Sequence, residues 1–146
     1  MERKTKDIFI DGPVPASRIS DSIRDHSTKT GIGAHAIFLG QVRADAKPEG
    51  IVIAIEYSAF VEMALEKAYE IREAIFTKYE LSCMHIWHSL GKVRAGEICL
   101  FIFTSAPGRR AAIDACNETV ARIKAELPVW GLEVLDNQKQ VWKENT

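Results

Sequence analysis

Two apolar segments joined by a short, glycine-bounded connection constrain the fold of this chain more than any other feature. Residues 81–90 and 97–105 are rich in apolar side chains, and the connection between them begins at Gly91 and ends at Gly96. Glycine supplies the backbone conformations that tight turns need. The pattern therefore predicts an antiparallel hairpin of two strands.

Two further segments have the three- and four-residue periodicity of amphipathic helices. The clearer one runs from about residue 60 to residue 79, and its predicted buried face consists of Phe60, Met63, Ala64, Ala68, Ile71, Ala74 and Ile75. The second begins after Pro107-Gly108 and ends at Pro128, because proline cannot continue the helical hydrogen-bond ladder. Its predicted buried stripe consists of Ala112, Ile113, Cys116, Val120 and Ile123.

The remaining apolar runs predict shorter elements. We expect a short helix at 17–26, a mobile loop at 43–50, and strands at 8–10, 34–42, 51–57, 129–135 and around 141–142. Few strand–helix–strand crossovers are present, so the order of elements predicts an α+β fold with a mainly antiparallel sheet and two main helices. Residues 1–146 are expected to form one domain, in which residues 1–33 supply an N-terminal strand and the short helix.

Composition and charge exclude several classes of protein. Hydrophobic residues make up 47% of the chain, enough for one core without disulfides or a structural metal. The net charge of −1 gives no reason to expect a nucleic-acid or membrane partner. The apolar runs are far shorter than the roughly 20 residues of a membrane-spanning helix. The charged N-terminal residues do not resemble a signal peptide, so a cytoplasmic location is expected.

The cysteines and histidines give no support to a metal or cofactor site. The three cysteines lack C-x-x-C spacing and fall on predicted strands or an apolar helix stripe, so we interpret them as buried structural thiols. His85 and His88 are three residues apart on a predicted strand, where their side chains point to opposite faces. Neither a glycine-rich phosphate loop nor a hydrolase nucleophile motif is present.

Three arginines occupy positions that favour anion binding. Arg43 follows an apolar strand, and Arg109 with Arg110 lies in the first turn of the second long helix. Positive charge there opposes the helix dipole, at a cost of a few tenths of a kcal/mol up to about 1 kcal/mol. Helix N-terminal amides and arginine both bind phosphate. Anion recruitment and simple solvation of the two helical arginines are both open interpretations.

Lys124 lies at the border of the buried stripe of the same helix, one turn before Pro128. A lysine in that position commonly extends along its own stem to water. A partly buried amine near other cations would instead have a lowered pKa and act on a carbonyl or acyl group. Spacing alone leaves both interpretations open.

Several segments, in order over residues 34–145, resemble motifs of the molybdopterin synthase large-subunit (MoaE) family. The strand at 38–43 resembles the family's F-x-G-x-V-R motif, and 124–130 resembles its K-x-x-x-P-x-W signature. The other matching residues are Glu56-Tyr57-Ser58-Ala59-Phe60, Met63-Ala64, His88-Ser89-Leu90-Gly91, Val93, Gly96-Glu97, Thr104-Ser105-Ala106, Arg109 and Trp142-Lys143.

The resemblance implies an α/β-hammerhead-like fold and an enzyme of molybdenum cofactor biosynthesis. Such an enzyme transfers two sulfurs to cyclic pyranopterin monophosphate and forms molybdopterin. The sulfur comes from the C-terminal thiocarboxylate of a small ubiquitin-like subunit whose Gly-Gly tail enters the large subunit's pocket. Large subunits form a central homodimer, which becomes a heterotetramer with two small subunits, and the pockets borrow residues across the dimer.

By the same resemblance, Lys124 is the catalytic residue, and it would engage the thiocarboxylate or the substrate. Arg43 and one of Arg109 and Arg110 would hold the phosphate or stabilise developing charge. Pro128 and Trp130 of the signature are also expected to contact substrate.

Two departures from the family pattern bear on activity. The histidine that commonly precedes the family's arginine is absent, since the chain reads Pro107-Gly108 before Arg109 and Arg110, which leaves the arginine's register ambiguous. The lysine that usually follows the signature tryptophan is replaced by Gly131, with Lys139 and Lys143 as candidate substitutes.

These departures leave three hypotheses for the function. The first is an active synthase subunit, and the second is a non-catalytic homologue that acts as a partner-binding scaffold. The third is an unrelated anion-binding domain.

Overall fold

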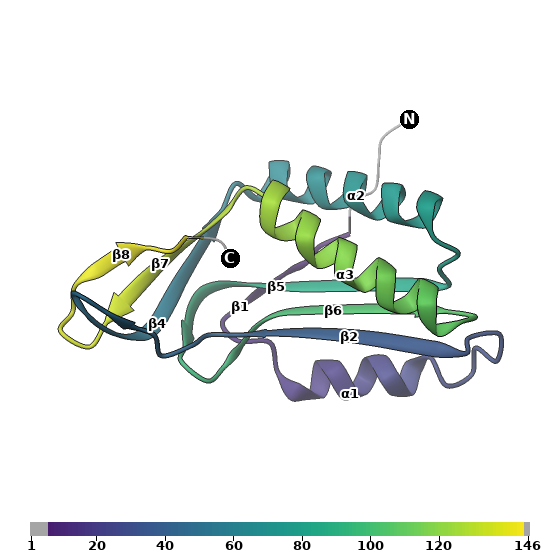
Figure 1. Ribbon diagram of the computed structural model, residues 1–146, viewed down its shortest axis with the longest axis horizontal. Coiled ribbons are helices and arrows are strands. Elements are labelled where there is room, and N and C mark those ends of the chain that lie inside the picture. Colours follow the sequence, from purple (N-terminus) through teal and green to yellow (C-terminus); the bar gives the residue numbers. More distant parts are fainter. Residues whose placement is uncertain (1–5, 145–146) are drawn as a thin grey trace.

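A twisted, mainly antiparallel sheet forms the centre of the molecule, and helices cover both of its faces (Figure 1). The computed structural model describes residues 6–144. The elements, in chain order, are β1 (Phe9–Asp11), α1 (Ala16–Asp25), β2 (Ala34–Gln41), β3 (Ala46–Lys47), β4 (Gly50–Ala59), α2 (Val61–Lys78), β5 (Cys83–Arg94), β6 (Ile98–Ala106), α3 (Arg109–Glu126), β7 (Val129–Leu135) and β8 (Gln140–Trp142).

The sheet order is β2-β6-β5-β4-β7-β8, with β1 beside β5 and β3 beside β4. All of these pairings are antiparallel except that of β1 with β5. Helices α2 and α3 lie on one face and α1 on the other (Figure 1). The predicted α+β class and mainly antiparallel sheet are confirmed.

The predicted hairpin is also confirmed, but its turn lies further along the chain than expected. Strand β5 continues through Gly91 to Arg94, and the turn spans residues 95–97. Residues 83–88 of β5 pair with β6, whereas residues 91–94 pair with β4. Gly91 has φ +78°, a left-handed conformation that glycine adopts without steric cost. It therefore bends the strand toward a new partner instead of ending it.

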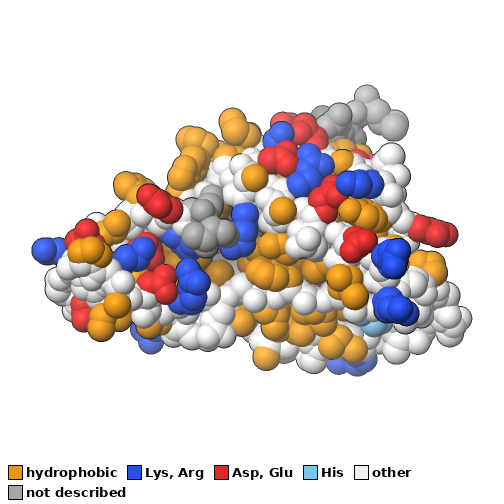
Figure 2. Space-filling view, in the orientation of Figure 1, with side chains coloured by type: hydrophobic (Ala, Val, Ile, Leu, Met, Phe, Trp, Pro, Cys, Tyr) orange, Lys and Arg blue, Asp and Glu red, His pale blue; other side chains and the backbone are white. Residues whose placement is uncertain are grey.

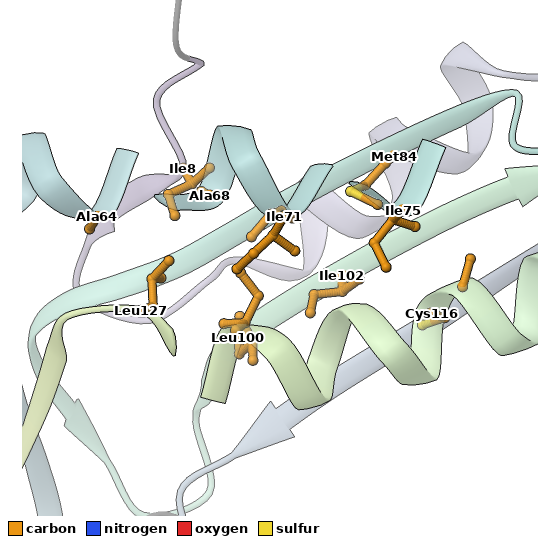
Figure 3. Close-up of a cluster of buried hydrophobic side chains, with 13 residues drawn as sticks. Ile8, Ala64, Ala68, Ile71, Ile75, Met84, Leu100, Ile102, Cys116 and Leu127 are labelled. Carbon is orange, nitrogen blue, oxygen red and sulfur yellow. The ribbon is translucent and has the colours of Figure 1, made fainter. Parts of the chain in front are cut away.

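The main core fills the space between the sheet and helices α2 and α3. In Figure 3, Ile71 of α2 points toward Leu100 of β6, and Cys116 and Leu127 approach from α3 and the residue that follows it. A second core lies under the bent end of the sheet and consists of Val42, Val52, Ile55, Val93 and Leu135. A third lies on the α1 face around Val14, Phe101 and Phe103. The bend in β5 thus separates two packing units that share one sheet.

Helix α2 buries a narrower face than the sequence predicts, and α3 buries a shifted one that includes Ala115 and Thr119. On α2, Ala64, Ala68, Ile71 and Ile75 are buried, but Met63 is 59% exposed and Phe60, just before the helix, is 62% exposed; Ala74 is also exposed. On α3, Ile113 is 55% exposed. Steps of three and four residues trace a single stripe, and a residue one position away is rotated about 100° around the helix.

The predicted loop at 43–50 implied an irregular segment, but part of this segment is a strand. Ala46 and Lys47 form β3, which pairs with Ile51 and Gly50 at the start of β4. Gly50 has φ +145° and provides the tight return between the two strands. The structure therefore corrects the predicted loop to a small hairpin that leads directly into β4.

A cluster of histidines lies under α1, away from α2 and α3. His26 is buried, and its Nε2 atom lies 3.3 Å from Nε2 of His85. Nδ1 of His35 lies 2.7 Å from the hydroxyl of Ser105. Burial, together with the nearby His26, lowers the pKa of His85 to about 4. The His85 ring is therefore neutral in the folded protein at pH values where an unfolded histidine is charged.

This cluster predicts a loss of stability in mild acid. Between pH 6.5 and pH 4 the unfolded chain takes up a proton on His85 that the folded chain does not, so the free energy of unfolding falls as pH is lowered. A pKa shift of this size, if fully effective, corresponds to about 3 kcal/mol in the free energy of unfolding. Because the ring is only partly buried, solvent screening reduces the expected loss to about 1–2 kcal/mol. Urea unfolding of the wild type and of His85→Gln between pH 7.5 and pH 4.5 measures this loss. If the free energy of unfolding changed equally with pH in both proteins, the prediction would be contradicted.

Candidate functional site

A pocket of about 270 Å³ lies where the two packing units meet. One wall comes from residues 38–43 at the end of β2 and from the last turn of α3. The opposite wall comes from β4, β7 and the residue after β8, with Ile55, Tyr57, Gly131 and Lys143. In Figure 2, Lys and Arg side chains gather in this region, beside the β7–β8 end of the molecule.

Lys124 enters the pocket from the last turn of α3. Its neighbour Ile123 is 3% exposed and packs into the main core, so the helix is anchored at this point. A cation in the last turn of a helix also interacts favourably with the helix dipole. The helix ends at Glu126 because Pro128 follows, and the chain then turns directly into β7. Lys124 is therefore positioned by a packed helix end rather than by a loop.

Arg43 and Lys143 bring two more cations to the same pocket. Arg43 directly follows the buried Val42 at the end of β2, and its Nε atom lies 3.3 Å from a carboxylate oxygen of Asp45. Lys143 is partly buried on the opposite wall. Burial lowers the pKa of Lys143, and the positive charge of Lys124 lowers it further.

Two carboxylates balance part of this charge. Asp45 pairs with Arg43, and Glu133, which is 4% exposed, lies 3.2 Å from the amine of Lys47. Among the lining residues, three cations thus face two carboxylates that already have ion-pair partners. The pocket therefore has an excess of positive charge and suits an anionic ligand.

Neutral polar groups form the inner wall of the pocket. Nδ1 of His88 donates to the carbonyl of Ser89 at 2.8 Å, and burial lowers the pKa of the His88 ring, so the imidazole is neutral. Burial raises the pKa of the Tyr57 phenol, and the adjacent Cys99 thiol raises it further. The Cys99 thiol donates to the carbonyl of Gly40 at 3.4 Å. These groups offer hydrogen bonds without adding charge.

The structure brings together some of the sequence-predicted site residues and separates others. Arg43, Lys124 and Trp130 line the pocket, and Pro128 lies between two residues that line it. Arg109 and Arg110 are exposed at the opposite end of α3, about 22 Å from Lys124 by helix rise. Within one chain they do not reach the pocket.

Sequence reasoning missed the contributions of Tyr57, Cys99 and Glu133. Interpreting all three cysteines as buried was wrong for two of them, since Cys116 is buried but Cys83 and Cys99 are only partly buried. A usable signal existed for Glu133, which is a charged residue within an otherwise apolar predicted strand. Within residues 6–144 no group of His, Cys, Asp and Glu is arranged to hold a metal ion, and no helix is long and apolar enough to cross a membrane.

Comparison with known proteins gives consistent matches. The family described as MoaE protein matches residues 12–126. A molybdopterin synthase catalytic subunit from Oryza sativa subsp. indica is 34% identical over 134 residues, which cover 92% of this chain and 66% of the rice protein. The chain thus spans just under two thirds of that relative. The protein of the same name from Pyrococcus abyssi is 34% identical over 115 residues, or 77% of this chain and 74% of the relative.

Solved structures share the fold over nearly the whole chain. Molybdopterin synthase from Staphylococcus aureus superposes with a TM-score of 0.83 at 25% identity, covering 97% of this chain and all of the other. A chain from the complex of subunits 1 and 2 of molybdopterin-converting factor from Helicobacter pylori superposes with a TM-score of 0.78 at 15% identity, covering 93% and 88%. With the family match over residues 12–126, the chain belongs to the MoaE protein family.

Proposed function

We propose that this chain is the catalytic subunit of a molybdopterin synthase. It would convert cyclic pyranopterin monophosphate to molybdopterin by taking one sulfur from the C-terminal thiocarboxylate of each of two small ubiquitin-like subunits that bind in turn. The observation that carries the proposal is the convergence of Lys124, Arg43 and Lys143 on one pocket in a chain of the MoaE family. The substrate phosphate and the thiocarboxylate are both anions, so both suit this pocket.

The residues of the pocket support distinct roles in this chemistry. Lys124, held by the packed end of α3, engages the thiocarboxylate or the reacting part of the substrate. Fixed cations in a partly desolvated pocket stabilise charge that develops during the reaction. Cys99 is not required as a sulfur donor, because the partner delivers the sulfur, and its thiol is already directed at the carbonyl of Gly40.

An exposed apolar surface beside the pocket suits the small subunit. Phe60 and Trp130 stack edge-to-face with ring centroids 5.0 Å apart, and they are 62% and 42% exposed. Val61 and Met63 extend this surface onto the start of α2. Trp130 also lines the pocket, so a partner bound here could direct its C-terminal tail inward. Clusters of exposed aromatic and methionine side chains are typical of protein interfaces. The H. pylori complex joins two subunits of molybdopterin-converting factor.

A homodimer would explain the position of the two remote arginines. Among the described strands, β2 pairs only with β6, so its other edge is open, and Ile37, Leu39 and Ile113 leave apolar surface beside it. Figure 2 shows this apolar belt between α3 and β2. If two β2 edges met about a two-fold axis, the beginning of one strand would lie beside the end of the other. The Arg109–Arg110 end of one copy would then approach the pocket of its partner.

With one small subunit bound to each copy, this dimer would form a heterotetramer. The place of action that we propose is the cytoplasm. The three cysteines are free, which fits a reducing compartment.

A reconstituted assay tests the proposed function. The chain is mixed with precursor and with a small subunit that carries a C-terminal thiocarboxylate, and dithiolene product is measured after release and oxidation. We expect product with the thiocarboxylate and none with the same subunit ending in an ordinary carboxylate. Gly131, in place of the family's lysine, favours a non-catalytic scaffold as the second candidate function. Tight binding of the small subunit without product would support that alternative.

A further inference from the structure

Lys143 reaches the pocket from the C-terminal side of β8, directly beside Gly131. Strand β8 pairs antiparallel with β7, and the backbone N–H of Lys143 donates to the carbonyl of Gly131 at 2.8 Å. Gly131 in turn lies opposite Tyr57 of β4, on the wall of the pocket. The register of three strands therefore places the side chain of Lys143 at this wall.

The space above Gly131 has no room for a side chain of its own. A Cβ atom at position 131 would lie 2.9 Å from Cγ2 of Ile55, 3.3 Å from Cε1 of Tyr57 and 3.5 Å from Cβ of Lys143. The first distance is shorter than normal contacts allow, and Ile55 is buried in the second core. The Cβ atom of Lys143 lies at an ordinary van der Waals distance from this position, so the lysine lies directly beside Gly131.

The charges around Lys143 suit a ligand-binding amine. Lys124 and Arg43 act on it as like charges, while Glu133 attracts it. Burial and Lys124 lower its pKa. An anion between these cations relieves their mutual repulsion and gains charge-assisted hydrogen bonds. Lys139, on the turn between β7 and β8, is exposed and does not line the pocket.

We propose that Lys143 is a substrate-binding residue that supplies the pocket's second amine from the end of β8, beside a Gly131 whose position Ile55 and Tyr57 leave no room for a side chain. The chain would then lack a lysine on β7 because the same position in the pocket is filled from the neighbouring strand. The proposal rests on the proposed function for the identity of the ligand, the phosphate-bearing pterin precursor. It also gives a physical reason for the departure at position 131 that does not require loss of activity.

The test compares Lys143→Ala, Lys143→Arg and the matched control Lys139→Ala in the full chain. Precursor affinity is measured by calorimetry, and KM and kcat are measured with the thiocarboxylated small subunit. We expect Lys143→Ala to weaken precursor binding and raise KM by about 10- to 100-fold, the effect of losing one charge-assisted hydrogen bond. Lys143→Arg should recover most of the affinity, and Lys139→Ala should bind as the wild type does.

The two proposals fail in different ways. Wild-type affinity in Lys143→Ala, with thermal unfolding unchanged, would overturn the role of Lys143 whether or not the chain makes product. Equal weakening in Lys143→Ala and Lys143→Arg would also overturn it, because a charged side chain should substitute in part. If the wild type binds precursor but forms no product, the proposed function fails, while the binding comparison still decides on Lys143. A wild type that does not bind precursor overturns both.

Discussion

Lys124→Ala is expected to lower the rate of product formation by at least about 100-fold, the typical cost of removing a group that stabilises charge in a transition state. The lysine enters the pocket from the last turn of α3, while the adjacent Ile123 holds the helix in the core. Because the lysine's own side chain is not part of the buried core, the free energy of unfolding should change by less than about 1 kcal/mol. Single-turnover kinetics and urea unfolding measure the two effects separately.

Two further variants define what the Lys124 result means. Lys124→Arg keeps the positive charge but replaces the compact amine. It therefore distinguishes a requirement for positive charge from a requirement for the amine itself. Lys92→Ala, an exposed lysine that does not line the pocket, should retain wild-type turnover. Unchanged turnover in Lys124→Ala would remove Lys124 from the catalytic role and leave the pocket as a binding site alone.

Mixing two inactive variants is expected to restore activity. One carries Lys124→Ala and the other carries Arg109→Ala together with Arg110→Ala. If each pocket combines Lys124 of one copy with the arginines of the other, a mixed dimer has one intact pocket and one doubly defective pocket. Random pairing makes half of the dimers mixed, so turnover should return to about one quarter of the wild-type value. The measurement is product formation after the two proteins are refolded together.

The mixed-dimer experiment has a clear opposite outcome. If each pocket is built from one chain, every pocket in the mixture carries a defect, and turnover stays at the level of the separate variants. The single changes Arg109→Ala and Arg110→Ala, each mixed with the Lys124 variant, then identify which arginine takes part. Sedimentation of the wild type provides the necessary measure of its oligomeric state.

Local sequence patterns predicted most of the helices and strands, because these elements depend on residues that are close together in the sequence. Strand β7 was predicted at 129–135 and is observed there, because Pro128 ends the preceding helix and fixes where the strand begins. The change of partner within β5 was not predictable, because Gly91 has the same sequence signal in a turn and in a bend. Exposure of Ile113 depends on how far the sheet extends beneath α3, which periodicity along the helix does not contain.

The candidate site was predictable only in part, for a related reason. Arg43, Lys124 and Trp130 belong to motifs that can be read along the chain. Lys143 and Gly131 become neighbours through the pairing of β7 with β8, and Tyr57 joins them through the pairing of β4 with β7. Such register is set by long-range packing. The sequence could name Lys143 only as one of two alternatives to the missing lysine.

The pocket lies across the junction between two separately packed cores, with Lys124 on one side and Lys143 on the other. Neither core alone determines the distance between these amines. A ligand that contacts both must fix one core relative to the other, and part of its binding energy is used for that ordering. Once bound, the ligand connects the two cores. The ligand-bound protein should therefore unfold in one cooperative step that includes both cores, which are joined where the sheet bends.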